Sequence, residues 1–316
     1  MADLHITTPL LRHDPLSAAL GKQVLLKMDS LQPSGSFKLR GIGRMCQRAV
    51  QAGARHLVCP SGGNAGFAAA VAGRSLGVPT TIVVPHTTPE SVRRQIQAIG
   101  ATLKVHGSVW DEANEEALRL CREGGVYVPP FDHPDIWDGN ATLIDEAVRQ
   151  AEGGLDAVVC SVGGGGLLCG VLEGLHRNGL PNVPVVAVET EGAASFHASV
   201  KAGALVTLPA ITSIATTLGA KRVAPAALEW TRRHRVHSVT VTDAQATEAC
   251  LCFADDLRVL VEPACGAALA VAYGRLDVLA PFQRPLLVVC GGIAVDLEKL
   301  RAWHAGRATS GREAGE

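Results

Sequence analysis

The chain has 316 residues, a formal net charge of -1 and 19% charged residues. This charged fraction lies below the roughly 25% of an average soluble protein, which indicates that much of the chain is buried. A net charge near zero excludes a broad electrostatic footprint for nucleic acid and gives no attraction to an anionic membrane surface.

The N-terminal stretch Met1–His5 lacks the basic and apolar segments of a secretory signal, which predicts a cytoplasmic protein. The most apolar long window, Ala157–Leu175, is interrupted by four consecutive glycines and is therefore unsuited to crossing a membrane. None of the nine cysteines shows C-x-x-C spacing, so we expect buried thiols and no zinc site.

Short β-rich runs alternate with segments of helical period, a βα pattern that predicts an α/β fold with open, mostly parallel sheets covered by helices. The expected strands are Val24–Met28, His56–Cys59, Thr80–Val84, Thr102–Val105, Asp156–Ser161, Val185–Glu189, Ser238–Thr242 and Leu286–Cys290. The expected helices are Gly63–Ser75, Pro89–Ala98, Val109–Cys121, Ala141–Ala151, Leu167–Arg177, Asp243–Asp256 and Gly266–Tyr273. The polar residues from Gly306 onward are expected to be disordered.

The segment Val126–Pro134 is rich in proline and aromatic residues and separates two blocks of βα units. We therefore predict two lobes. Residues 39–135 form the small domain, and residues 1–38 and 136–316 form the large domain. Ligands of such sheets bind beyond the carboxyl ends of the strands, so the cleft between the lobes is the expected site.

Lys38 follows a glycine-serine turn, directly after an expected strand and next to Phe37. Most lysines are solvated surface charges, so the position by itself indicates little. In a cleft, however, its amine could form a Schiff base while Phe37 offers a flat apolar face to an aromatic cofactor.

The run Cys59–Gly66 joins a strand to a helix. Backbone N–H groups at that helix start form an anion site, to which Ser61 and Asn64 add polar side chains. A substrate carboxylate fits there, although an ordinary helix cap explains the local pattern equally well.

Four consecutive glycines, Gly163, Gly164, Gly165 and Gly166, also link a strand to a helix. Successive N–H groups without Cβ atoms can surround a phosphate closely. A dinucleotide-binding turn is the competing interpretation, since Glu189 ends the next strand, but the G-x-G-x-x-G spacing fails. Cys290 ends the last expected strand, and by itself it is best explained by packing. We assign no role to the histidines.

Taken together, Pro33–Lys38, Ser61–Gly66, the four glycines and Cys290–Gly292 resemble the L-serine dehydratase and serine dehydratase-like family. This family belongs to the fold type II, tryptophan-synthase-β-like enzymes that use pyridoxal 5'-phosphate (PLP). The resemblance covers residues 5–300, including Lys27–Ser30, Thr81–Pro85, Val128–Asp132 and Val261–Ala268.

The resemblance implies a role for each matching residue. Lys38 would be the Schiff-base lysine, Phe37 would pack on the pyridine ring, and Cys290 would meet the ring nitrogen. Asn64 would bind the cofactor's 3'-oxygen. The substrate carboxylate would be held by Ser61, Gly62, Asn64 and Ala65, and the phosphate by Gly163–Gly166 and Leu167. A monovalent cation, expected to be K⁺, would be bound by Gly163, Glu189, Ala193, Ser195, Leu218 and Ala220.

The implied activity is conversion of L-serine to pyruvate and ammonia, with L-threonine giving 2-oxobutanoate. The implied partners are a small amino-acid substrate and a second copy of the chain in a homodimer, with no nucleic acid or membrane.

Glycine at position 62 resembles the dehydratase-like branch of the family, whereas related serine racemases carry a serine there. Residues Ile293–Val295 depart from the more polar residues of relatives. Alternatives are a PLP-dependent β-replacement enzyme, a nicotinamide-dependent oxidoreductase and a catalytically silent binding protein.

Overall fold

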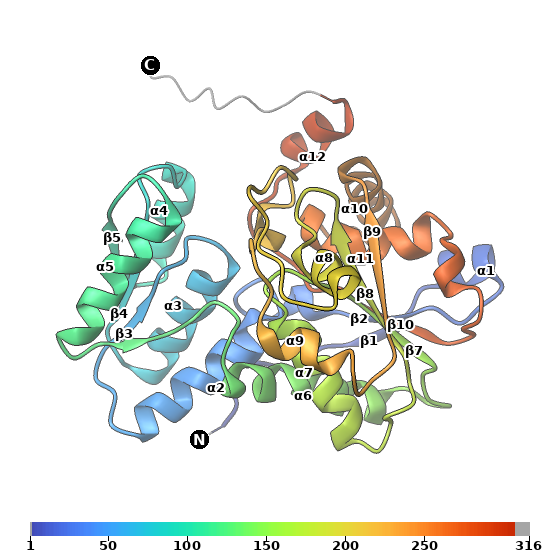
Figure 1. The fold of residues 1–316 in the computed structure, drawn as a ribbon, viewed down its shortest axis with the longest axis horizontal. Helices are drawn as coiled ribbons and strands as arrows, with labels where there is room; N and C mark the ends of the chain where they lie inside the picture. Colours follow the sequence, from blue (N-terminus) through green and yellow to red (C-terminus); the bar gives the residue numbers. More distant parts are fainter. Residues whose placement is uncertain (1, 307–316) are drawn as a thin grey trace.

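The computed structural model describes residues 2–306, and their strands form two separate sheets (Figure 1). The larger sheet has six strands in the order β1-β2-β10-β7-β8-β9. Their bounds are Leu10–Arg12 (β1), Leu25–Lys27 (β2), Pro285–Val288 (β10), Ala157–Ser161 (β7), Val185–Thr190 (β8) and Val236–Val241 (β9). All neighbouring strands are parallel except β1 and β2. The carboxyl ends of β2, β10, β7, β8 and β9 therefore share one edge of the sheet.

The smaller sheet has four parallel strands in the order β5-β4-β3-β6. Their bounds are Thr102–Val105 (β5), Thr80–Val84 (β4), Leu57–Cys59 (β3) and Val126–Tyr127 (β6). All of them fall inside the small domain predicted for residues 39–135. The division of the chain into a small and a large domain stays a prediction. Two separate sheets are what such a division requires.

Helices cover the faces of both sheets (Figure 1). Those nearest the small sheet are Lys38–Gln51 (α2), Asn64–Leu76 (α3), Glu90–Ala98 (α4) and Trp110–Arg122 (α5). The others are Asp14–Leu20 (α1), Pro134–Gln150 (α6), Gly166–Arg177 (α7), Ser195–Ala202 (α8), Pro225–Trp230 (α9), Asp243–Leu257 (α10), Pro263–Tyr273 (α11) and Leu297–His304 (α12). Helix α2 packs on both α3 and α6, so it joins the two halves of the molecule.

The core follows from the buried apolar strands that the sequence shows. Every residue of β4, β7 and β10 is buried, as expected for parallel strands covered on both faces. One continuous core surrounds the six-stranded sheet, and a second lies around the four-stranded sheet. No helix within residues 2–306 is long and apolar enough to cross a membrane.

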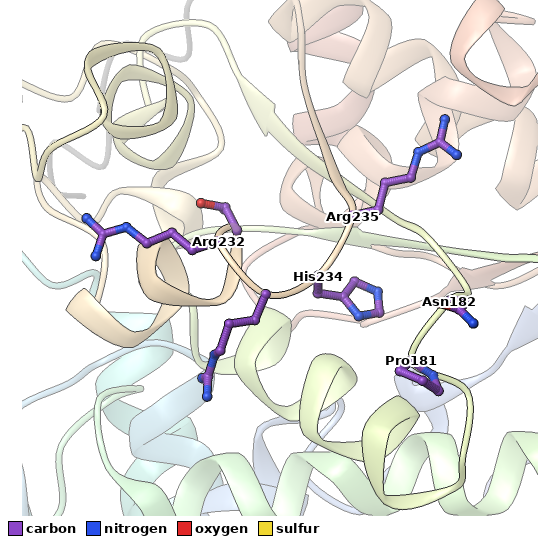
Figure 2. A pocket seen from close by; sticks show the side chains of 7 residues that line it. Pro181, Asn182, Arg232, His234 and Arg235 are labelled. Carbon is purple, nitrogen blue, oxygen red and sulfur yellow. The ribbon is translucent and has the colours of Figure 1, made fainter.

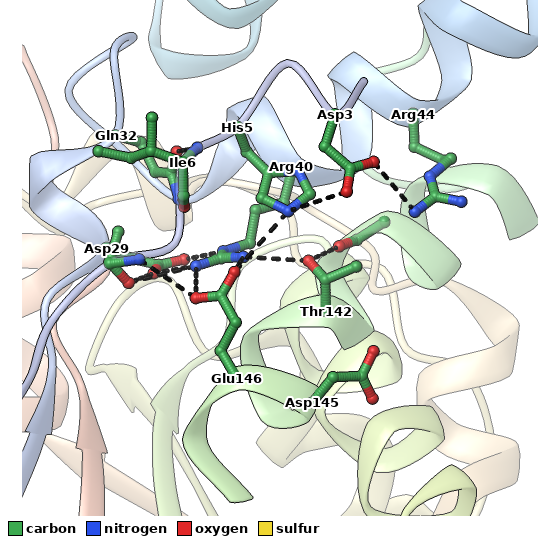
Figure 3. Close-up of polar contacts among 12 residues, drawn as sticks. Asp3, His5, Ile6, Asp29, Gln32, Arg40, Arg44, Thr142, Asp145 and Glu146 are labelled. Carbon is green, nitrogen blue, oxygen red and sulfur yellow. Dashed lines mark hydrogen bonds and ion pairs between the residues drawn. The ribbon is translucent and has the colours of Figure 1, made fainter. Parts of the chain in front are cut away.

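A buried ionic cluster fixes α2 to the large sheet and to α6 (Figure 3). The Arg40 guanidinium group donates to both carboxylate oxygens of Asp29, at 2.7 and 2.9 Å, and to both of Glu146, at 2.7 and 2.8 Å. Lys27 on β2 donates to Glu146 at 2.6 Å. Two cations face two anions, so the cluster satisfies its charges without water.

The α/β fold class with mostly parallel sheets is confirmed, and each expected strand overlaps an observed one. The sequence analysis missed β1 and β6, and it missed α1, α2, α8, α9 and α12. Helix α6 begins at Pro134, inside the segment that we had interpreted only as a boundary. The disorder expected from Gly306 onward concerns residues 307–316, which lie outside the described residues.

Candidate active site

Lys38 is the first residue of α2 and stands beside the carboxyl end of β10. Ser36 and Gly291 form an isolated β-bridge, and the Phe37 amide donates to the Cys290 carbonyl at 3.0 Å. The Lys38 Nζ atom lies 5.3 Å from the centroid of the Phe37 ring. Burial lowers the pKa of Lys38 to about 8. A substantial fraction of this amine is therefore neutral and nucleophilic near neutral pH.

The loop from Ser61 to Ala65 follows β3 and starts α3. The Ser61 hydroxyl accepts a hydrogen bond from the Gly63 amide at 3.3 Å. A Cβ atom on Gly66 would lie 1.8 Å from the Ser61 carbonyl oxygen, so only glycine allows the turn to close. The first amides of α3 have no partner within the helix, so they are available to an anion, as the expected binding of a substrate carboxylate requires.

The four glycines join β7 to the 12-residue helix α7, and they form a cradle that side chains would fill. A Cβ atom on Gly163 would lie 3.0 Å from the Leu218 Cα, and one on Gly164 would lie 2.2 Å from the Phe131 ring. Gly165 has a φ of +90°. The exposed amides and the positive end of the α7 dipole suit a phosphate group.

Cys290 lies two residues beyond β10 and is buried. Hydrogen bonding to Cys265, followed by burial, raises the pKa of the Cys290 thiol well above its ordinary value. The thiol is therefore neutral, which suits contact with an uncharged ring nitrogen.

Three residues that the sequence analysis gave no role also lie at this site. The carbonyl oxygen of Pro130 accepts from Lys38 Nζ at 2.6 Å, and the Phe131 ring lies against the glycine loop. Glu262 accepts from Asn64 Nδ2 at 2.7 Å. Pro130 and Phe131 had been interpreted as part of a domain boundary and of the resemblance, and Glu262 only as part of the resemblance.

Buried oxygen atoms without partners offer a test of whether a polar cofactor fits here. Among the described residues, Ser36 Oγ, Ser161 Oγ and Glu262 Oε2 are buried without a hydrogen-bond partner. Buried polar groups are rarely left unpaired, so atoms of this kind indicate that another polar group binds near them. Together with the glycine cradle and the amine of Lys38, they fit PLP.

Glu189, the penultimate residue of β8, is the acid among the residues expected to hold a cation. Its two oxygens accept from the amides of Phe196 at 2.9 Å and His197 at 2.6 Å. Burial raises the pKa of Glu189 to about 8, and these two amides act against the shift. Ala193, Ser195 and Leu218 are buried, and Ala220 is half-buried. Glu189 is the one acid of the set, so it does not form a multi-carboxylate site.

A surface pocket of about 530 Å³ lies elsewhere, at the amino ends of β8 and β9 (Figure 2). Its lining includes Arg233 as well as Arg232 and Arg235, whose side chains point away from each other. The glycine loop stands at the opposite, carboxyl edge of the sheet. The pocket therefore does not belong to the site around Lys38.

Comparison with known proteins gives consistent results. Residues 1–291 match the family model described as pyridoxal-phosphate dependent enzyme. The L-serine dehydratase/L-threonine deaminase of Homo sapiens is 48% identical over 309 residues, covering 95% of this chain and 94% of that protein. The serine dehydratase-like protein of Homo sapiens is 49% identical, covering 94% and 93%. These identities do not separate the two branches.

A solved structure agrees with these relatives. The L-serine ammonia-lyase of Rhizomucor miehei superposes with a TM-score of 0.91 at 39% identity, covering 97% of this chain and all of that one. The similarity thus extends over both sheets and the site between them.

Proposed function

Because the chain belongs to the family of pyridoxal-phosphate dependent enzymes, we propose that it is an L-serine dehydratase that also deaminates L-threonine. The observation that carries the proposal is the placement of the Lys38 amine, with its lowered pKa, among the glycine cradle, Asn64 and Cys290. The relatives named L-serine dehydratase/L-threonine deaminase and L-serine ammonia-lyase support the reaction and the substrates.

In this proposal each part of the site has one task toward the cofactor. Lys38 would attach it, Phe37 would pack against its ring, and Asn64 would bind its 3'-oxygen. The cradle of Gly163–Gly166 and Leu167 would hold its phosphate, and Cys290 would face its ring nitrogen. When bound, PLP withdraws electrons from the α-carbon of the attached amino acid.

The protein's own groups orient the substrate and move its α-proton. Ser61, Asn64 and the amides of Gly62 and Ala65 bind the substrate carboxylate, which fixes the α-carbon relative to Lys38. The Lys38 amine, once free, is a base with a pKa near working pH and accepts the α-proton. The β-hydroxyl leaves as water once a general acid gives it a proton, and the phosphate that the glycine cradle would hold is the nearest donor. Hydrolysis of the product gives pyruvate and ammonia.

The direct test is incubation of the PLP-loaded protein with L-serine and with L-threonine. We expect pyruvate from the first and 2-oxobutanoate from the second, each with one equivalent of ammonia. Product that retains the amino group, formed only when a thiol is added, would instead identify a β-replacement enzyme. Absence of any product from both substrates in PLP-loaded protein would contradict the proposal.

The assembly is a further part of this proposal. We infer a homodimer, because two-fold dimers are the commonest soluble assemblies. Sedimentation equilibrium of the full chain at several concentrations tests the dimer.

A further inference from the structure

Glu262 directly precedes α11, yet its side chain does not cap that helix. A side chain at this position ordinarily accepts a hydrogen bond from an amide of the first turn. Here the amides of Cys265 and Gly266 donate to the main-chain carbonyl of Glu262 instead. Only 3% of the residue is exposed. The buried carboxyl group therefore needs another explanation than helix capping.

The carboxyl group of Glu262 fixes the orientation of the Asn64 amide. Its Oε1 atom accepts from Asn64 Nδ2 at 2.7 Å, and on the other side Asn64 Oδ1 accepts from the Ile293 amide at 3.1 Å. Turning the Asn64 amide over would place its oxygen against the carboxyl oxygen and its NH₂ group against an N–H donor. One N–H of Asn64 is then left for another acceptor.

Glu262 is itself held in one place. Thr217 donates to the same Oε1 atom at 2.6 Å. A Cβ atom on Gly292 would lie 2.0 Å from the Glu262 Cδ atom, so the chain leaves room for this carboxyl group by having glycine there. Asn64 starts α3 beside the small sheet, whereas Thr217 and Gly292 lie beside the large one. The contact therefore crosses between the two halves of the molecule.

The second carboxyl oxygen of Glu262 indicates that burying this carboxyl group costs free energy. Oε2 is buried and makes no hydrogen bond of ordinary geometry within the described residues. Burial raises the pKa of Glu262, while Thr217, Asn64, the Ala294 amide and the charge of Lys38 act in the opposite direction. A carboxyl oxygen buried with so little compensation is unfavourable for stability alone, which indicates a functional role.

We propose that Glu262 is a positioning residue, which orients the Asn64 amide toward the cofactor and thereby strengthens the binding of PLP. The inference rests on the proposed function, because it takes Asn64 to be a cofactor ligand. Glu262 acts through Asn64 and need not touch the reacting atoms.

The affinity of the apoprotein for PLP, measured by absorbance titration, tests this inference. Glu262→Ala is expected to weaken binding by about tenfold, since it removes a hydrogen bond to a carboxyl group. Glu262→Gln keeps a side-chain oxygen that both Asn64 and Thr217 can use, so we expect its affinity to stay within about threefold of wild type.

A double-mutant cycle with Asn64→Ala separates positioning from a general structural effect. If Glu262 acts through Asn64, the double variant binds PLP no more weakly than the weaker single variant. Glu116→Gln is the matched control, because it alters another buried carboxylate, paired with Lys104 and Arg119 beside the small sheet, and should leave PLP affinity unchanged.

The outcomes are distinguishable. Unchanged PLP affinity in a folded Glu262→Ala protein, or losses that add fully in the double variant, would overturn the inference while leaving the proposed function intact. Failure of the wild-type protein to bind PLP would contradict the proposed function instead. If Glu262→Ala does not fold, Glu262→Asn replaces it, since its shorter side chain stays polar but cannot reach Asn64, and wild-type affinity in that variant counts against the inference.

Discussion

The Nζ atom of Lys38 donates a hydrogen bond of 2.6 Å to the carbonyl oxygen of Pro130. Lys38 begins α2, whereas Pro130 belongs to the connection between β6 and α6, so the contact joins segments 92 residues apart in the chain. A carbonyl oxygen accepts from a charged or a neutral amine, and more strongly from the charged one. The contact therefore remains available to the amine in both of its protonation states.

Lys38 is expected to be the single residue that borohydride fixes to the cofactor. Peptide mapping of PLP-loaded, reduced protein should find the adduct on Lys38. The rate at which the apoprotein takes up PLP should rise with pH, and the midpoint of this rise should lie near pH 8. Burial lowers the pKa of the Lys38 amine to about 8, and only the neutral amine attacks a carbonyl. Lys38→Ala should lose activity by on the order of 10²–10⁴ as the α-proton acceptor disappears.

An adduct on a different lysine would remove this assignment. Lys22 is a suitable comparison in the same protein, because it is a half-buried lysine outside the site that donates to the Ala280 carbonyl at 2.8 Å. We expect no cofactor there after reduction.

Loss of Arg40 is expected to destabilise the protein strongly. Arg40→Met leaves the buried carboxylates of Asp29 and Glu146 without their main partner, which typically costs about 3–5 kcal/mol in the free energy of unfolding. Arg44→Met is the matched control on the same helix. Its ion pairs with Asp3 and Asp138 are longer and partly exposed, so we expect a loss below about 1 kcal/mol. Urea unfolding measures both, and equal losses would contradict the prediction.

The buried ionic cluster around Arg40 also predicts that the free energy of unfolding depends on pH. Burial acts to raise the pKa of Glu146, but the hydrogen bonds and charges of Arg40 and Lys27 outweigh it and leave the pKa below 4.5. A lowered carboxyl pKa contributes stability that is complete above pH 4.5 and is lost as pH falls through the folded value. Without Arg40 the pKa of Glu146 moves up toward its unfolded value, so the stability that Arg40→Met loses on acidification should be smaller than in wild type.

The sequence predicts the fold where burial is local and continuous. β4 and β7 are apolar along their whole length, so their positions follow from composition. β6 has only two residues, and it forms because β3 pairs with it. Helix α2 was missed because Gly41 and Gly43 weaken its local propensity, and its buried face is decided by packing on α3 and α6.

The residues of the site also divide into those that the local sequence predicts and those that only the folded chain brings together. Lys38, Asn64 and the four glycines stand in strand-to-helix turns, where a local motif indicates their chemistry. Glu262 reaches Asn64 across 198 residues, and only the folded chain brings them together. The one local signal was an acid in a run that is otherwise apolar from Val259 to Ala272.

Potassium is expected to stabilise the protein more than sodium does, through oxygen atoms around Glu189. Burial raises the pKa of this carboxyl group to about 8, so a bound cation must displace a proton at neutral pH. The shift in Tm caused by potassium should therefore grow as pH rises from 6.5 to 8.5. Glu189→Gln should abolish the effect, and equal Tm values in potassium, sodium and cation-free buffer would contradict it.

Cys290 is expected to react slowly with alkylating reagents in the native apoprotein. Its thiol is buried and its pKa is raised, so little thiolate is present or accessible. Cys121 and Cys252 are half-buried and serve as internal comparisons. Mass spectrometry of iodoacetamide-treated protein should find both of them modified before Cys290, and early modification of Cys290 would show that its thiol is more open than described.

Elimination is expected to proceed without racemisation of serine, because return of a proton to the opposite face of the α-carbon needs a second donor. Lys38 serves one face, and Gly62 has no side chain with which to serve the other. In deuterated water, chiral chromatography at partial conversion should find unreacted serine still in the L form. D-Serine formed at a rate comparable to pyruvate would contradict this prediction.

Gly62→Ser should introduce racemisation, because it supplies a hydroxyl where related serine racemases carry a serine. A Cβ atom on Gly62 would lie 3.1 Å from Thr88 Cγ2 and 3.2 Å from Val84 Cγ1, so both side chains must shift slightly. We expect a stability loss of about 1 kcal/mol from this tight packing. Gly62→Ala produces the same crowding without the hydroxyl and is the control. D-Serine should therefore form with Gly62→Ser and not with Gly62→Ala, and its appearance in both would show that crowding, not the hydroxyl, opens the second face.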